Sequence, residues 1–141
     1  MGKGTVIKSA EVQTLYVDKT YSSKMLLDQT NSETKGIQIN QGFISPGSKH
    51  ADHYHHVDYD EVYLIMKGEA KVRLDGVETD LAAGDVVHIP GGTMHAIENK
   101  SDTEELVIFT AWSRHPEQGI NPVYDMRVKA WGKSYKTIDE E

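Results

Sequence analysis

Four histidines fall between positions 50 and 56 of this 141-residue chain. The surrounding stretch, GSKHADHYHHVDYDE at residues 47–61, also carries several carboxylates. Imidazole and carboxylate groups can transfer protons or bind a divalent metal. Such a cluster can equally be a solvated loop, because histidine side chains are often partly exposed. The spacing of the residues is what favours one interpretation over the other.

His53 and His55 are separated by one residue, so both imidazoles point to the same face of an extended strand. Glu61 follows after a short polar connection, and Tyr63 shares its face of the next predicted strand. His95 comes after a turn, in a comparable position. Three imidazoles and one carboxylate leave positions open on a six-coordinate metal, where substrate, water or oxygen can bind.

The chain contains no cysteine, which excludes disulfides and thiolate metal sites. Any metal must therefore be held by nitrogen and oxygen atoms. Mixed imidazole and carboxylate ligation is compatible with several divalent transition metals, namely Fe, Mn, Zn or Ni, and does not choose among them.

The length of 141 residues predicts one domain with a sizeable core. A formal net charge of −7 disfavours nucleic acid and anionic membrane surfaces as partners. The N-terminus lacks the apolar segment of a secretory signal, and no stretch approaches the roughly 18 apolar residues of a membrane span. These features predict a soluble, cytoplasmic protein that acts on a small molecule.

Short apolar runs separated by turn residues predict an all-β sandwich or barrel. The Asp75-Gly76 dipeptide lies between two alternating segments and predicts a tight two-residue hairpin. Residues 124–131 are compatible with a short helix or an extended arm. The predicted strands cover residues 5–17, 24–27, 36–40, 61–66, 70–74, 77–81, 86–89, 95–98 and 106–112.

The run VYLIM at residues 62–66 does not alternate between polar and apolar residues. Both faces of this predicted strand should therefore be covered. In a small barrel the outer cover must come from residues 1–20 or from a second subunit. The size of the protein favours the second subunit, and hence a homodimer.

Two segments carry motifs of a known family. Gly84-x5-Pro90-x-Gly92-x2-His95-x3-Asn99 resembles the second cupin motif at every position, while Gly47-x5-His53-x-His55 and Glu61-x6-Gly68 resemble both ends of the first. The resemblance covers roughly residues 36–111.

This resemblance implies an all-β fold, the double-stranded β-helix or jelly-roll cupin barrel. The expected organisation is one structural domain, with N-terminal strands or a short extension at 1–35, the barrel at 36–112 and a C-terminal arm or short helix at 113–141.

The resemblance also implies that His53, His55, Glu61 and His95 converge on one metal. One departure concerns the five residues between His55 and Glu61, because the usual motif has three or four. Two alternatives therefore stay open: His56 replaces one of the histidine ligands, or Asp60 replaces Glu61. Otherwise His50 and His56 are interpreted as rim residues.

The ligand set favours a metal-dependent enzyme, a dioxygenase or an isomerase or lyase, that binds a small oxygen-rich metabolite. Glu61 and Tyr63 are its candidate catalytic residues, and the Tyr63 phenol would act as an acid or base or orient a ligand. The alternative is a non-catalytic cupin that binds or senses a sugar or other metabolite. A closed structural metal site is disfavoured, because such sites are usually four-coordinate.

The sequence leaves open which further side chains face the barrel interior. The candidates are Gln38, Gln41, Tyr63, Arg73, His88, Phe109 and Trp112.

Overall fold

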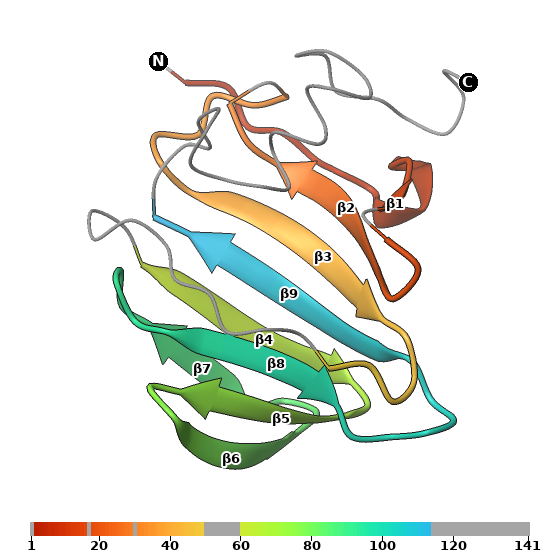
Figure 1. Ribbon diagram of the computed structural model, residues 1–141. Coiled ribbons are helices and arrows are strands. Elements are labelled where there is room, and N and C mark those ends of the chain that lie inside the picture. Colours follow the sequence, from red (N-terminus) through yellow and green to blue (C-terminus); the bar gives the residue numbers. More distant parts are fainter. Residues whose placement is uncertain (1, 17, 30, 50–59, 114–141) are drawn as a thin grey trace.

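The computed structural model describes residues 2–16, 18–29, 31–49 and 60–113. Within this part of the chain, two antiparallel sheets pack face to face (Figure 1). The six-stranded sheet has the order β1 (Leu15–Tyr16), β2 (Tyr21–Leu27), β3 (Gln38–Ile44), β9 (Leu106–Trp112), β4 (Glu61–Lys67) and β7 (Val86–Ile89). The three-stranded sheet has the order β6 (Val77–Ala82), β5 (Glu69–Leu74) and β8 (His95–Asn99). The predicted all-β jelly-roll fold is confirmed.

The predicted hairpin at Asp75-Gly76 is also confirmed. Leu74 pairs with Val77, so the two residues between them form the whole connection from β5 to β6. Asp75 has a φ of 47° and Gly76 a φ of 83°. Positive values at both central positions are what a two-residue turn of this type requires, and Asp and Gly tolerate them well.

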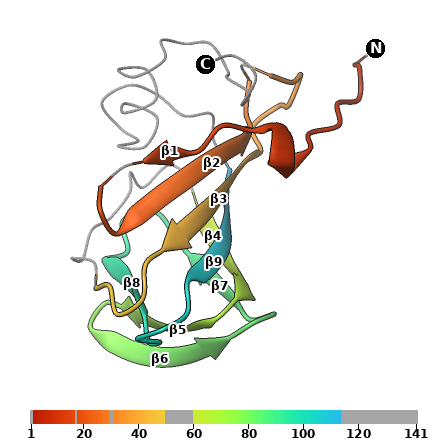
Figure 2. The ribbon, with the colours of Figure 1, turned by 90° about the vertical axis from the view of Figure 1, so that its right-hand side faces the viewer.

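The N-terminal segment differs from the single long strand predicted over residues 5–17. Ser9–Glu11 forms a turn of 3-10 helix, and only Leu15–Tyr16 pairs with β2. The Ser9 hydroxyl donates a 2.7 Å hydrogen bond to the Gln41 side chain, and Lys24 Nζ donates to the Ser9 carbonyl at 2.8 Å. Side chains of β2 and β3 thus hold this segment, which lies beyond β2 at the edge of the sheet (Figure 2).

Register divides the interior of the large sheet into an apolar half and a polar half. Gly42, Ile108 and Ile65 lie in one cross-strand row, and Ile44 and Leu106 lie in the next. Together with residues of the facing sheet they form the apolar core, which comprises Ile44, Tyr63, Ile65, Ala70, Val72, Val87, Ile89, Ile97, Leu106 and Ile108. Burial of these side chains supplies the main driving force for folding.

The other half of the same interior face carries most of its polar side chains on β3, β9 and β4. Asn40, Thr110 and Tyr63 form one row across β3, β9 and β4. In the next row, Gln38 pairs with Trp112, and Trp112 pairs with Glu61. The side chains of both rows are buried. Burying a polar group costs free energy that its hydrogen bonds must offset, so these two rows contribute less to stability than the apolar rows do.

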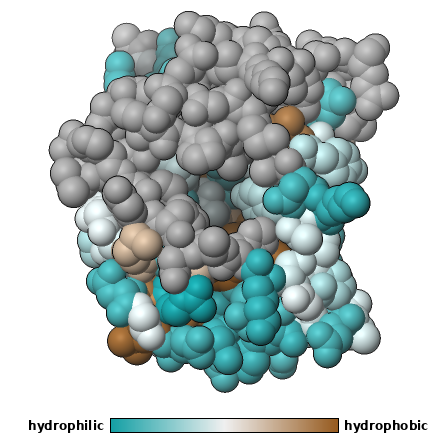
Figure 3. Space-filling model, in the orientation of Figure 1, coloured by the Kyte–Doolittle hydropathy of each residue, from teal (hydrophilic) through white to brown (hydrophobic). Residues whose placement is uncertain are grey.

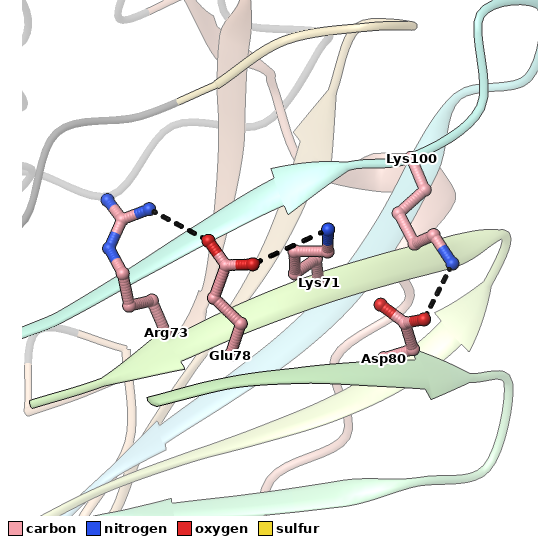
Figure 4. Close-up of polar contacts among 5 residues, drawn as sticks. All are labelled: Lys71, Arg73, Glu78, Asp80 and Lys100. Atoms are coloured by element: carbon pink, nitrogen blue, oxygen red, sulfur yellow. Dashed lines mark ion pairs between the residues drawn. The ribbon is translucent and has the colours of Figure 1, made fainter. Parts of the chain in front are cut away.

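The outer faces of the two sheets differ in character. On the small sheet, Glu78 lies 3.6 Å from Lys71 and 3.8 Å from Arg73, and Lys100 lies 3.0 Å from Asp80 (Figure 4). Figure 3 shows the hydrophilic colouring over this part of the molecule. Such exposed ion pairs contribute little to stability, but they make this outer face polar and well hydrated.

The outer face of the large sheet is apolar in its central part. On β4 the side chains alternate, so that Tyr63 and Ile65 are buried while Val62 and Leu64 are half-buried on the outside. Leu64 pairs with Phe109, which is also half-buried. We call Phe43, Val62, Leu64, Val107 and Phe109 the outer apolar face.

No helix in the described segments is long and apolar enough to cross a membrane.

Asn99 ties three elements together at the apolar end of the barrel. Its side-chain nitrogen donates to the Ile44 and Glu104 carbonyls at 3.0 and 2.8 Å, and its oxygen accepts from Ser101 N at 3.0 Å. We expect Asn99→Ala to lower the free energy of unfolding by about 2 kcal/mol, because buried carbonyls would lose their donors. Urea unfolding measures this change. Asn99→Asp should be similarly destabilised, since it keeps the acceptor and loses both donors; wild-type stability in both variants would contradict the assignment.

Candidate metal centre

Glu61 and His95 approach each other across the barrel interior. Glu61 is the first residue of β4 in the large sheet, and His95 is the first residue of β8 in the small sheet. Glu61 Oε1 lies 3.5 Å from His95 Nε2. The two residues are 3% and 0% exposed, so the contact is shielded from solvent. Closure of the two sheets therefore brings together two of the four candidate ligands.

The backbone fixes which nitrogen of His95 faces Glu61. His95 Nδ1 lies 2.9 Å from the Thr93 carbonyl oxygen. A carbonyl only accepts hydrogen bonds, so Nδ1 carries the proton. A neutral ring in this state presents the Nε2 lone pair to a carboxylate oxygen. Two acceptors in contact need a cation between them, either a proton or a metal ion.

The Glu61 and His95 pair fits a divalent metal. Metal–nitrogen and metal–oxygen bonds of about 2.1 Å require two ligand atoms to lie within about 4.2 Å of each other, and the observed 3.5 Å satisfies this limit. A ligating histidine commonly donates its other N–H to a backbone carbonyl, as His95 does to Thr93. The donor set of nitrogen and oxygen suits the transition metals predicted from the sequence.

Two of the proposed ligands, His53 and His55, lie outside the described residues, as do the rim candidates His50 and His56. Among residues 2–16, 18–29, 31–49 and 60–113, no group of three histidine, aspartate or glutamate side chains is placed to hold a metal. The geometry of a complete ligand set therefore stays a prediction.

Asp60 and Glu61 point in different directions. Asp60 Oδ2 lies 3.4 Å from His88 Nε2, and both of these side chains are more than half exposed. Glu61 is buried beside His95. Of the two acids that the sequence left as alternatives, Glu61 is the one that shares the interior with His95.

Tyr63 lies beside this pair. Its ring centre is 6.1 Å from that of His95, with the planes inclined at 70°. Burial raises the pKa of Tyr63 well above its usual value, and the Glu61 charge and a hydrogen bond to Glu61 raise that pKa further. The phenol therefore keeps its proton at neutral pH and acts as a donor.

A second tyrosine, Tyr21, reaches the same interior and was not recognised from the sequence. A side chain at Gly42 would place its Cβ 3.2 Å from Tyr21 Cε2, so the glycine makes room for the ring. Burial and the Glu61 charge raise the pKa of Tyr21 to about 12. No motif in the surrounding sequence would have identified it.

The structure shows which of the residues left open by the sequence face the barrel interior. Gln38, Tyr63 and Trp112 face the interior and are buried. Asn40 and Thr110 join them and were missed, because a polar residue at an alternating position usually indicates the wet face of a strand. The other four candidates face outward. Gln41 accepts a hydrogen bond from Ser9, and Arg73 pairs with Glu78. His88 lies near Asp60, and Phe109 is half-buried on the outer face.

The cupin domain family matches residues 43–112 of the chain. This protein belongs to the cupin superfamily. The matched region includes β4 to β9 and therefore both Glu61 and His95.

Two curated relatives show which cupins this protein resembles. It is 27% identical over 109 residues to the oxalate-binding protein of Thermotoga maritima, covering 73% of this chain and 89% of that protein. It is 26% identical over 112 residues to the tetracenomycin polyketide synthase protein TcmJ of Streptomyces glaucescens, covering 77% and 74%. Two further relatives are matched over only 46% and 53% of their own length.

The structure of KdgF from Halomonas sp. superposes on this cupin with a TM-score of 0.72. The two sequences are 18% identical, and the match covers 82% of this chain and 97% of KdgF. At that identity the likeness shows a shared fold.

Proposed function

We propose that this cupin is a metal-dependent enzyme that binds a small oxygen-rich metabolite at a divalent transition metal. His53, His55, Glu61 and His95 would hold the metal. The observation that carries the proposal is the buried contact between Glu61 Oε1 and His95 Nε2, with the His95 proton held on the opposite nitrogen by Thr93.

A bound divalent cation would supply either Lewis-acid stabilisation of a substrate oxygen or a redox centre for oxygen. Both kinds of chemistry, oxygenation by a dioxygenase and proton transfer by an isomerase or lyase, begin with a substrate that offers oxygen ligands. The side chains of this chain would then orient the substrate, exclude water and handle protons.

Tyr63 would serve as a proton donor. Burial is the largest cause of its raised pKa and does not depend on what Glu61 binds. A phenolate at this position is therefore disfavoured at neutral pH, which argues against Tyr63 as the resting general base. A protonated phenol beside Glu61 and His95 can donate a hydrogen bond to an oxygen that gains negative charge.

The polar rows beside the centre would contact the substrate. Gln38, Asn40 and Thr110 are buried, uncharged and carried by neighbouring strands of one sheet. Amide and hydroxyl groups recognise hydroxyl and carbonyl groups by hydrogen bonds and impose orientation on a ligand in a concave site. These side chains therefore favour a substrate that is rich in hydroxyl or carbonyl groups.

The second candidate is a cupin that binds or senses a sugar or other metabolite without turnover. The similarity to a protein named for oxalate binding favours it. Such a protein would need the same buried polar rows but would release its ligand unchanged. Stoichiometric metal without conversion of any metabolite would support this candidate over the enzyme.

Elemental analysis of the purified protein, together with identification of any copurified small molecule, tests the proposed function. The enzyme hypothesis predicts about one divalent transition metal per chain. Oxygen consumption in the presence of iron and the copurified compound would then indicate an oxygenase, whereas conversion without oxygen uptake would indicate an isomerase or lyase. Protein that binds none of Fe, Mn, Zn or Ni when they are added would refute the proposal.

We also propose that a second copy of the chain covers the outer apolar face. The outer apolar face of the large sheet contrasts with the outer face of the small sheet, which is charged and hydrated. An apolar patch on one side of a small barrel is typical of a symmetric contact between two copies.

Light scattering should show that wild-type protein has twice the mass of one chain and that Leu64→Glu has the mass of one chain. The reason is that a carboxylate in the centre of the patch would lose its hydration on association. Lys71→Glu places the same residue on the charged sheet and should leave the mass unchanged. A single-chain mass for the wild type would exclude the dimer, and a dimeric Leu64→Glu would exclude this interface.

A further inference from the structure

The tip of the hairpin between β5 and β6 contacts the residue that precedes His95. Asp75 N donates to the Met94 carbonyl at 2.8 Å, and Met94 N donates to Asp75 Oδ1 at 3.1 Å. These two bonds join positions 19 residues apart in sequence. Leu74 then pairs with His95 as β8 begins. The hairpin tip therefore binds both hydrogen-bonding groups of Met94 directly before the proposed ligand.

The two bonds that orient His95 share one peptide group. Met94 N and the Thr93 carbonyl belong to the same peptide, which is planar and normally trans, so its N–H and C=O point in opposite directions. Asp75 Oδ1 accepts from the N–H side, and His95 Nδ1 donates to the C=O side. Fixing the N–H of this peptide therefore fixes the direction of the carbonyl that holds the imidazole.

From this geometry we infer that Asp75 is a positioning residue for His95. The functional consequence of this inference rests on the proposed metal centre, but the contacts that carry it involve only Asp75, Thr93, Met94 and His95. A carboxylate on the N–H also polarises the peptide, which makes the Thr93 oxygen a better acceptor and the His95 ring a better electron donor at Nε2. Asp75 thus sets both the orientation and the donor strength of the ring.

The backbone at Asp75 allows this role to be separated from the turn itself. Asp75 is the only residue other than glycine with positive φ in the described segments. Glycine adopts this conformation without steric strain, so Asp75→Gly removes the carboxylate while preserving the turn. Asparagine also tolerates it and keeps an acceptor oxygen, so Asp75→Asn preserves the geometry without the charge.

Asp85 provides a matched control. In the turn between β6 and β7, Asp85 Oδ2 accepts from Ala82 N at 2.8 Å, and Asp85 N donates to the Ala82 carbonyl at 3.0 Å. This pair of hydrogen bonds between Asp85 and Ala82 has the same pattern as the pair between Asp75 and Met94, but it does not involve the peptide that holds His95. Asp85→Gly should therefore show the general cost of losing such a contact.

Zn²⁺ affinity, measured by competition with a chelator, is the first test. We expect Asp75→Gly to bind Zn²⁺ about tenfold more weakly than wild type, at the lower end of the loss seen for direct partners of metal ligands, because Asp75 acts through the Thr93 peptide. Asp75→Asn should recover most of this affinity, and Asp85→Gly should bind as wild type does. Equal losses in Asp75→Gly and Asp85→Gly, or none in Asp75→Gly, would overturn the inference.

The second test uses the metal-free protein. In proton NMR, the bond to Thr93 should protect the Nδ1 proton of His95 from exchange with water, and Asp75→Gly should accelerate that exchange at least several-fold. Unchanged exchange would refute the positioning role. If wild-type protein binds no Zn²⁺ while exchange responds as expected, the positioning role stands and the proposed metal centre fails.

Discussion

His95→Ala should lower the affinity of the protein for a divalent metal by more than about 100-fold. Loss of an oriented partner of a ligand already costs 10–100-fold, and here the ligand itself is removed. The remaining carboxylate of Glu61 would lie in the interior without the imidazole that faces it at 3.5 Å. Metal content after purification and Zn²⁺ titration of the metal-free protein both measure the effect.

Two variants make this result specific. His88→Ala removes an exposed histidine from the neighbouring strand β7 and should leave metal binding unchanged. His95→Gln fills more of the space left by the buried ring and shows whether any loss in His95→Ala comes from a packing defect. Circular dichroism should show all three variants folded. Metal binding at wild-type level in both His95 variants would contradict the assignment of His95 as a ligand.

Glu61→Gln should lower the pKa of both interior tyrosines in the metal-free protein. The Glu61 charge is the second-largest cause, after burial, of the raised pKa of Tyr21 and of Tyr63. A neutral amide removes the repulsion that opposes phenolate formation. Titration of tyrosine ring signals by NMR should place Tyr21 clearly below its wild-type pKa of about 12.

The same variant should change how stability depends on alkaline pH. The folded-state pKa of Tyr21 lies above the unfolded value of 10.0, so the folded protein holds more protons between pH 10 and about 12. Stability therefore falls as pH rises through this window, by up to about 1.4 kcal/mol per pH unit for each such tyrosine. In Glu61→Gln the fall should be shallower.

Asp60→Asn is the matched control for these titrations. It removes the acid next to Glu61 in sequence, but that acid pairs with His88 on the outside of the sheet. The tyrosine titrations should therefore stay as in wild type. An equal effect of Asp60→Asn, or no effect of Glu61→Gln, would show that Glu61 does not act on the phenols.

The sequence was most informative where local chemistry and spacing decide the structure. The Asp75-Gly76 turn, the strand over Leu106–Trp112 and the strand over Val86–Ile89 were all predicted with the observed bounds. Turn residues with positive φ and apolar runs of strand length leave few alternatives. The family motifs predicted that His95 and Glu61 lie inside the same barrel.

Alternation failed as a guide at the polar end of the barrel. In β3 the residues Gln38 and Asn40 are buried, while Ile39 and Phe43 lie half-buried outside. The usual assignment of polar residues to the solvent face would invert this strand. Only the register with β9 and β4 shows that these side chains share rows with Tyr63 and Glu61.

The N-terminal segment was also predicted incorrectly. A strand over residues 5–17 was expected from the pattern of short runs between turn residues, but Ser9 forms hydrogen bonds with Lys24 and Gln41 instead of pairing in a strand ladder. Such contacts depend on residues 15 and 32 positions away in sequence, which no local pattern contains.

The separation of apolar and polar rows has a consequence for how this barrel can change. Core side chains such as Ile44 and Leu106 lie in rows away from Glu61, whereas the core residues Tyr63 and Ile89 lie next to it. If the polar rows contact the substrate as proposed, substitutions at Gln38, Asn40 and Thr110 should alter ligand preference while leaving the apolar rows, which supply the main driving force for folding, unchanged. The same scaffold is thus suited to acquire new substrates by evolution or by laboratory selection.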